Sequence, residues 1–91
     1  MSWTIKWTKK AREDYAETLT FVEQSYGRNS ALRLLEKVEK AILRIQRFPQ
    51  IYPFSEKLNA HKAVVSKQVS IIYLVGDTEI FISRIKDNRM G

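Results

Sequence analysis

The residues best suited to chemistry are basic side chains in the last third of the chain. Cutting a phosphodiester without a metal needs cations around the phosphate and a group that moves a proton. Histidine is the side chain type that ordinarily titrates near neutral pH, and the chain holds only one. The candidates for such a site are His61, Lys62, Lys67, Arg84 and Arg89, and those for contact with a partner are Lys62, Lys67, Arg84, Lys86 and Arg89.

Each candidate also has a purely structural interpretation. Arg84 has the same strand parity as Ile80 and Ile82, which predicts a sheet-face arginine that pairs with a carboxylate such as Asp87 or binds a partner. His61 next to a lysine is a weak candidate for a general base. The strand-end lysines are most simply solvated charges: Lys62, Lys67 and Lys86.

Composition limits the possible functions. The 91 residues are enough for a single domain over residues 1–91, and the net charge of +6 favours a polyanionic partner, either nucleic acid or an acidic protein. The absence of cysteine excludes disulfides and thiolate metal sites, and we expect neither a metal nor a cofactor. No apolar run is long enough to cross a membrane and no signal peptide is recognisable, so we expect a cytoplasmic protein.

Hydrophobic periodicity predicts a strand and two helices in the first half of the chain. Alternation over residues 2–7 predicts a half-buried strand, and Thr8 is the expected N-cap of a helix that ends at Gly27. Asn29 or Ser30 is the expected cap of a second helix, which Pro49 closes. The first apolar stripe is Ala11, Tyr15, Leu19, Val22 and Tyr26, and the second is Ala31, Leu34, Leu35, Val38, Ile42 and Ile45.

The aromatic residues of the first half of the chain and the basic residues of the second helix have simple structural interpretations. Trp3, Trp7, Tyr15 and Tyr26 are expected to pack in the core and not to stack on bases. The basic residues of the second helix are interpreted as a solvated surface spread around most of that helix: Arg33, Lys37, Lys40, Arg44 and Arg47.

The second half of the chain predicts an antiparallel meander. An apolar, proline-containing loop over residues 48–60, expected to be pinned to the core, leads to strands over 61–66, 68–75 and 79–89. Gly76 and Asp77 tolerate the positive φ of a tight hairpin. The predicted fold is α+β with the order β-α-α-β-β-β, in which a helical hairpin packs on one face of an antiparallel sheet. Apolar residues occur on both faces of the last two strands. This predicts that another element of this chain, or another chain, covers part of the face that the helices leave open.

The element order and several short motifs resemble the RelE/ParE superfamily of toxins from type II toxin–antitoxin systems. The resemblance spans nearly the whole chain and rests on the opening from Trp7 to Tyr15, the helix end followed by Phe48-Pro49, the strand from Ile71 to Val75, and the closing Asp87-Asn88-Arg89. RelE-like members are ribosome-dependent mRNA endoribonucleases. ParE-like members inhibit DNA gyrase without being nucleases, and in both branches a cognate antitoxin neutralises the toxin.

The departures from the family pattern favour the ParE-like branch. The resemblance implies an arginine at the head of the Ile71 strand, where this chain has Val69-Ser70, and a tyrosine or similar group beyond the last strand, where it ends with Met90-Gly91. The expected function is a bacterial, plasmid-stabilising type of toxin that inhibits growth by binding gyrase, with a possible toxin–antitoxin heterotetramer. The alternatives are a metal-independent endoribonuclease that acts on the ribosome and mRNA, and a degenerate module that only binds its antitoxin.

Overall fold

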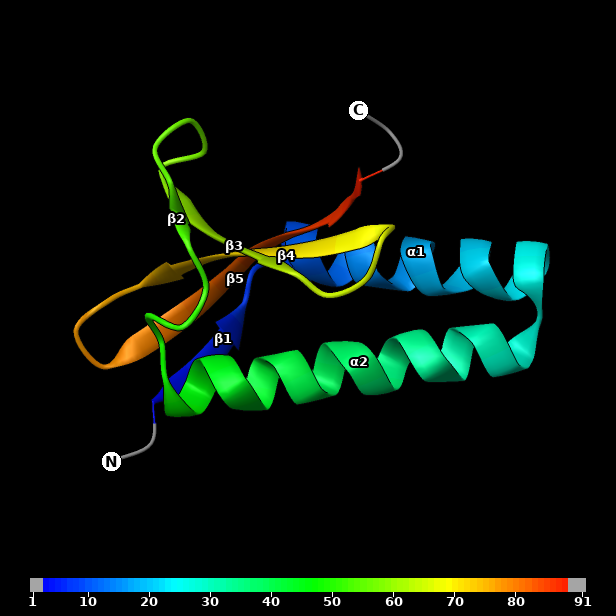
Figure 1. Cartoon of the computed structure of the whole chain (residues 1–91), viewed down its shortest axis with the longest axis horizontal. Helices are drawn as coiled ribbons and strands as arrows, with labels where there is room; N and C mark the ends of the chain where they lie inside the picture. The colour runs from blue at the N-terminus through cyan, green and yellow to red at the C-terminus, as the bar shows by residue number, and fades with distance from the viewer. Residues whose placement is uncertain (1–2, 89–91) are drawn as a thin grey trace.

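The computed structural model describes residues 3–88, which form two helices and a five-stranded sheet (Figure 1). The sheet has the order β1-β5-β4-β3-β2, so the N-terminal strand lies beside the C-terminal one. The predicted α+β fold and the meander are confirmed. The elements are β1 (Thr4–Trp7), α1 (Lys9–Tyr26), α2 (Arg28–Arg47), β2 (Phe54–Ser55), β3 (Ala60–Val64), β4 (Val69–Val75) and β5 (Glu79–Asp87).

Two features of the sheet go beyond the predicted antiparallel arrangement. β1 pairs with β5 in parallel, which makes the sheet mixed, and the loop over residues 48–60 contributes the short strand β2 at the opposite edge. The pairs β2–β3, β3–β4 and β4–β5 are antiparallel. Within residues 3–88, neither helix is long and apolar enough to cross a membrane.

Thr8 joins the start of α1 to β5. Its hydroxyl accepts a hydrogen bond from Ala11 N at 3.0 Å, which confirms the predicted N-cap. The same hydroxyl lies 3.2 Å from Ile82 O and 3.0 Å from Ser83 O, to which it can donate. α1 therefore begins where β1 stops and continues along the same edge of β5.

Gly27 is the only residue between the two helices. Its φ of +94° and ψ of 168° lie in a region that is essentially restricted to glycine. The residue ends α1, as predicted, and is also the N-cap position of α2, which has no side-chain cap; the predicted capping by Asn29 or Ser30 is wrong. Both residues are already inside the helix because the chain reverses within one residue.

Replacing Gly27 by alanine is expected to lower the free energy of unfolding by about 2 kcal/mol, measured by urea denaturation. The cost arises from the backbone alone, since no atom lies within 4 Å of the position a Cβ would take. Gln24→Ala on the exposed surface of α1 is the control and should change stability by less than about 0.5 kcal/mol. Equal stability of the two variants would show that the reversal does not depend on glycine.

The core lies between α2, α1 and one face of the sheet. Trp3, Trp7 and Tyr15 pack against it, as predicted, whereas Tyr26 is 57% exposed because the helices extend beyond the sheet at that end (Figure 1). The buried cluster consists of Ala11, Val22, Leu34, Val38, Ala41, Ile45, Ala63, Val69, Ile71, Tyr73, Ile80, Ile82 and Ile85.

A β-bulge in β5 changes which side chains face the core. Ile72 pairs with Arg84 and Tyr73 with Ile82, so Ser83 has no residue opposite it on β4. Ile82 and Ile85 are consequently both buried, and Arg84 is exposed. The predicted parity, with Arg84 on the face of Ile80 and Ile82, is wrong because one extra residue shifts the alternation.

A hydrogen bond joins the long loop over residues 48–60 to the core. Tyr73 Oη donates to Pro49 O at 2.7 Å, which ties the loop over residues 48–60 to the core as predicted, although Phe48 is 57% exposed. Among the described residues only Gly27 and Asn59 have a positive φ. The expected positive φ at Gly76 is therefore wrong.

Candidate functional site

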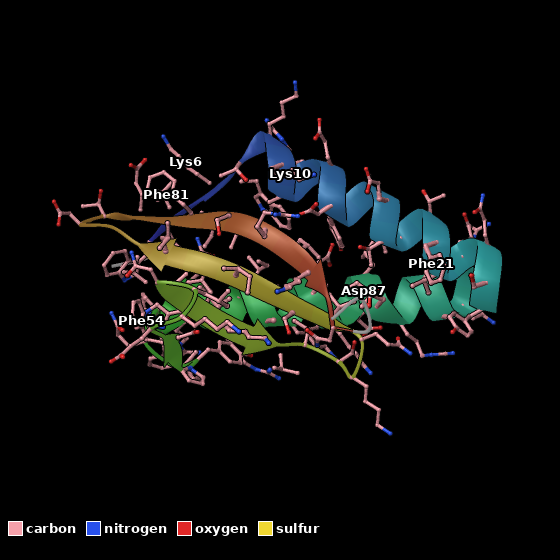
Figure 2. The ribbon with its side chains drawn as sticks, turned by 90° about the horizontal axis from the view of Figure 1, so that it is seen from above. Lys6, Lys10, Phe21, Phe54, Phe81 and Asp87 are labelled. Atoms are coloured by element: carbon pink, nitrogen blue, oxygen red, sulfur yellow. The ribbon has the colours of Figure 1, made fainter. Side chains whose placement is uncertain are left out.

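The register of the sheet gathers basic side chains on the face turned away from α2, here called the outer face (Figure 2). Lys62 pairs with Ile72, and Ile72 pairs with Arg84, so all three lie in one row across β3, β4 and β5. Directly paired residues on neighbouring strands project to the same side. Lys86, which pairs with Ser70, lies in the next row. The structure thus brings together three of the predicted residues, Lys62, Arg84 and Lys86.

A groove of about 440 Å³ lies on this outer face. Its floor is partly apolar, because Ile72 lies at its centre and Leu74 is 42% exposed. Two cations, Arg84 and Lys86, border it. The lining residues are Leu58, Asn59, Ala60, Ile72, Leu74, Ser83, Arg84 and Lys86. Apolar surface next to positive charge is the composition expected of a protein-binding surface.

Arg84 pairs with a carboxylate, one of the two roles predicted for it, and this carboxylate is Asp14 of α1. Arg84 Nε donates to Asp14 Oδ2 at 2.7 Å, and Arg84 Nη2 lies 3.4 Å from Asp14 Oδ1. Asp14 Oδ2 also accepts a hydrogen bond from Ile85 N at 3.2 Å. Asp14 therefore accepts the backbone hydrogen bond of β5 at a point that β1 does not reach. It also fixes the Arg84 guanidinium beside the groove.

The environment of Asp14 favours its ionised form. Burial by itself raises the pKa of this carboxyl, but the hydrogen bonds from Arg84 and from Ile85 N, together with the charges of Arg84 and Lys10, outweigh burial and lower the pKa below its usual value. The hydrogen bond with Asp14 in turn raises the pKa of Arg84. A carboxylate with a lowered pKa and several donors is a poor proton acceptor, so Asp14 positions Arg84 and is not suited to act as a base.

His61 lies on the core face of the sheet and not beside the other candidates. The residue is 8% exposed, and its Nδ1 lies 2.8 Å from Tyr52 O, which can only accept, so Nδ1 carries a proton. The imidazole stacks on Tyr73 with ring centroids 4.9 Å apart and meets Phe54 edge-on at 5.3 Å. These contacts assign His61 to packing and remove it from any site on the outer face.

The remaining predicted residues lie elsewhere. Lys67 is exposed in the turn between β3 and β4. Arg89 lies outside the described residues. Among residues 3–88, no group of three histidine, cysteine, aspartate or glutamate side chains could hold a metal ion.

The interpretation of the basic residues on α2 needs correction. Arg33, Lys37, Lys40, Arg44 and Arg47 follow at spacings of four, three, four and three, which places them on one side of a helix. They form a single stripe and do not spread around most of the helix. The spacing was readable from the sequence, since it repeats the period of the apolar stripe that packs in the core.

A protein-family comparison decides the family of the chain. The model of the ParE toxin of the type II toxin–antitoxin system parDE matches residues 5–91. The chain belongs to this ParE toxin family. Because such a toxin is one half of a two-component system, family membership implies a cognate antitoxin as partner.

Solved structures share the fold of this ParE-family toxin at low sequence identity. The chromosomal ParDE toxin–antitoxin system from P. aeruginosa matches with a TM-score of 0.79 and 22% identity, covering 93% of this chain and 95% of that one. The YoeB/ParE toxin from Agrobacterium tumefaciens matches with a TM-score of 0.69 and 15% identity, covering 93% and 98%. No curated protein sequence matches the chain.

Proposed function

We propose that this ParE-family toxin inhibits bacterial growth by binding DNA gyrase, without cutting nucleic acid, and that its cognate antitoxin neutralises it. The observation that carries the proposal is the composition of the outer face. Lys62, Arg84 and Lys86 lie on this face, Arg84 and Lys86 line its partly apolar groove, and His61 lies on the opposite face. Cations next to apolar surface suit a partner-binding face, whereas the metal-free cleavage of a phosphodiester also needs a positioned acid or base.

His61 and Asp14 are both engaged in contacts, and neither lines the groove. His61 is on the opposite face of the sheet with Nδ1 bound to Tyr52 O, and Asp14 accepts hydrogen bonds from Arg84 and Ile85. Arg84 is therefore presented as a fixed cation next to exposed Leu74. Such a surface suits a protein that carries both acidic and apolar side chains.

The antitoxin is the second partner in the proposal. Its support is the family itself and the ParDE system from P. aeruginosa, which shares the fold. We assign antitoxin contact to Lys62, Arg84 and Lys86 on the outer face, and the roles predicted for Lys67 and Arg89 stay predictions. A toxin–antitoxin heterotetramer and action in the cytoplasm are part of the same proposal.

A supercoiling assay with purified gyrase tests the proposal. Inhibition by the wild-type toxin is expected at micromolar concentration, and Lys62→Glu/Lys86→Glu should weaken it by about tenfold, since two charges that attract the partner become repulsive. Arg84 is left unchanged in this variant so that its bond with Asp14 is kept. The control is Arg12→Glu on the exposed surface of α1, which should inhibit like the wild type.

Three outcomes would contradict the proposal. Unimpaired gyrase at micromolar toxin would remove gyrase as the target. Cleavage of transcripts within reading frames after induced expression would instead identify a RelE-like endoribonuclease. No growth defect on expression without the antitoxin would indicate a module that only binds its antitoxin.

A further inference from the structure

Five basic side chains form a continuous stripe along α2, on the side of the helix next to β3 and the turn that follows it. The stripe from residue 33 to residue 47 spans about 21 Å at the usual rise of an α-helix. All five side chains are solvent-exposed, and they lie outside the groove described above. The α2 basic stripe consists of Arg33, Lys37, Lys40, Arg44 and Arg47.

The three arginines of the α2 basic stripe contact uncharged groups, which are two hydroxyls and an aromatic ring. Arg33 Nη2 donates to Ser30 Oγ at 3.1 Å, and Arg44 Nη1 donates to Tyr52 Oη at 3.2 Å. The Arg47 guanidinium lies over the Phe48 ring, 5.5 Å from its centroid. Such contacts restrict the side chains but leave their charge uncompensated. Within residues 3–88, the salt bridge found for the stripe joins Lys40 to Glu36 at 3.4 Å, and both side chains are exposed.

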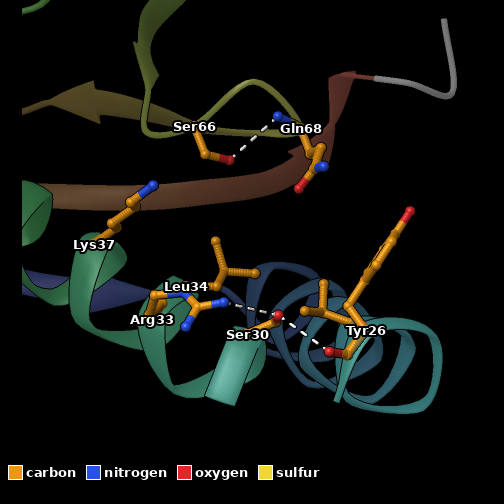
Figure 3. Close-up of a pocket in the computed structure, with 8 residues that line it drawn as sticks. Tyr26, Ser30, Arg33, Leu34, Lys37, Ser66 and Gln68 are labelled. Carbon is orange, nitrogen blue, oxygen red and sulfur yellow. Dashed lines mark hydrogen bonds between the residues drawn. The ribbon is translucent and has the colours of Figure 1, made fainter. Parts of the chain in front are cut away.

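Two hollows open along the α2 basic stripe. The first, of about 230 Å³, has Arg33 and Lys37 on one side and Ser66 and Gln68 of the turn on the other (Figure 3). Ser30 lines the same hollow, where its hydroxyl donates to Tyr26 O at 3.2 Å and accepts from Arg33. The second hollow, of about 150 Å³, continues along Lys37, Lys40 and Arg44. Cations together with hydroxyl and amide donors match the oxygens of a phosphate group.

We propose that the α2 basic stripe binds the phosphate backbone of duplex DNA. Regularly spaced cations on one side of a straight helix are the electrostatic signature of backbone contact. Single-stranded nucleic acid binds through aromatic rings on which its bases stack, whereas the stripe itself consists of cations, one of which, Arg47, lies over the Phe48 ring. An acidic protein would need apolar anchors at the centre of its contact, where the stripe instead presents Lys37 and Lys40.

The choice of DNA over duplex RNA rests on the proposed function, because gyrase acts on duplex DNA and a toxin bound to gyrase lies close to it. Binding of the α2 basic stripe to DNA would add to the proposed contact between the outer face and gyrase. The test below contains only toxin and nucleic acid. If the toxin does not bind DNA, the result of the supercoiling assay is unaffected. If the toxin does not inhibit gyrase, the result of the DNA-binding assay is unaffected.

The experiment measures fluorescence anisotropy of a labelled 24-base-pair duplex over a series of salt concentrations. Lys37→Gln/Arg44→Gln is expected to raise the Kd about tenfold and to reduce the slope of log K against log salt by about two, one for each lost phosphate contact. The matched control is Lys9→Gln/Lys57→Gln, which removes the same charge from exposed positions outside the stripe. The control should change the Kd by less than about twofold, and circular dichroism should show both variants folded.

Other nucleic acids and a polyanion complete the test. Equal weakening by the two double variants would overturn the proposal, because binding would then follow net charge alone. Tighter binding of single-stranded DNA, or equal binding of duplex RNA, would overturn the assignment to duplex DNA. Polyglutamate that competes as well as DNA at equal charge would identify the α2 basic stripe as a contact for an acidic protein.

Discussion

Replacing Asp14 by alanine is expected to lower the free energy of unfolding by about 3 kcal/mol, because the change removes a charge-assisted hydrogen bond and leaves a buried backbone donor unsatisfied. The charge-assisted bond is that of Arg84 Nε at 2.7 Å, and the orphaned donor is Ile85 N at the edge of β5. The Arg84 side chain is 52% exposed, so solvent screens its attraction to Asp14 and limits the contribution of this ion pair to stability. Urea denaturation of the purified toxin measures the effect.

The control for Asp14→Ala is Lys10→Gln. Lys10 Nζ lies 3.7 Å from Asp14 Oδ1, but its side chain is 58% exposed, so this variant should lose less than about 0.5 kcal/mol. A loss of the same size in both variants would show that the surface ion pair, and not the contact with β5, supports the fold.

Stability should also depend on pH through Asp14. The folded protein holds the pKa of Asp14 below its usual value, so between the two pKa values the unfolded chain binds more protons. The contribution is fully present above the pKa of the unfolded chain, about 3.9, and is lost as the pH falls through the lower folded pKa. The stability gap between wild type and Asp14→Asn is therefore expected to be constant above pH 5 or so and to shrink below about pH 4. A gap that grows on acidification would contradict this.

Replacing Tyr73 by alanine is expected to lower the free energy of unfolding by about 4 kcal/mol, measured in the same way. Tyr73 is fully buried in the centre of β4, and its ring stacks on His61. Its hydroxyl donates to Pro49 O at 2.7 Å. The truncation thus opens a cavity and releases the loop that follows α2.

Tyr73→Phe separates the two contributions. This variant keeps the ring and loses only the hydrogen bond to Pro49 O, so a loss of about 1 kcal/mol is expected. If phenylalanine were as destabilising as alanine, the hydroxyl and not the packing of the ring would hold this part of the core.

The comparison of sequence and structure shows where local patterns are sufficient. The helices followed from apolar spacing, and the cap at Thr8 and the reversal at Gly27 from residue chemistry. The strand order and the parallel edge at β1 did not follow, because pairing between β1 and β5 joins residues 75 positions apart, such as Thr4 and Glu79. The α2 basic stripe follows from the spacing of its residues along the helix.

The candidate site depended most on tertiary structure. The sequence identified Lys62, Arg84 and Lys86 as cations, and only the register placed them on one face. The bulge at Ser83 turned Arg84 outward and toward Asp14, a partner 70 residues away. The same register turned His61 inward, because His61 pairs with Tyr73 and shares its face.

The sequence by itself determined the family, the helices, the meander and the excess of positive charge, since each depends on residues close together in the chain or on composition. Only the tertiary structure decided which charges are fixed, which are free to bind and which polar groups are buried. The physical reason is that register, bulges and long-range ion pairs depend on contacts between distant segments, and a one-residue shift in a strand reverses the face of every side chain beyond it.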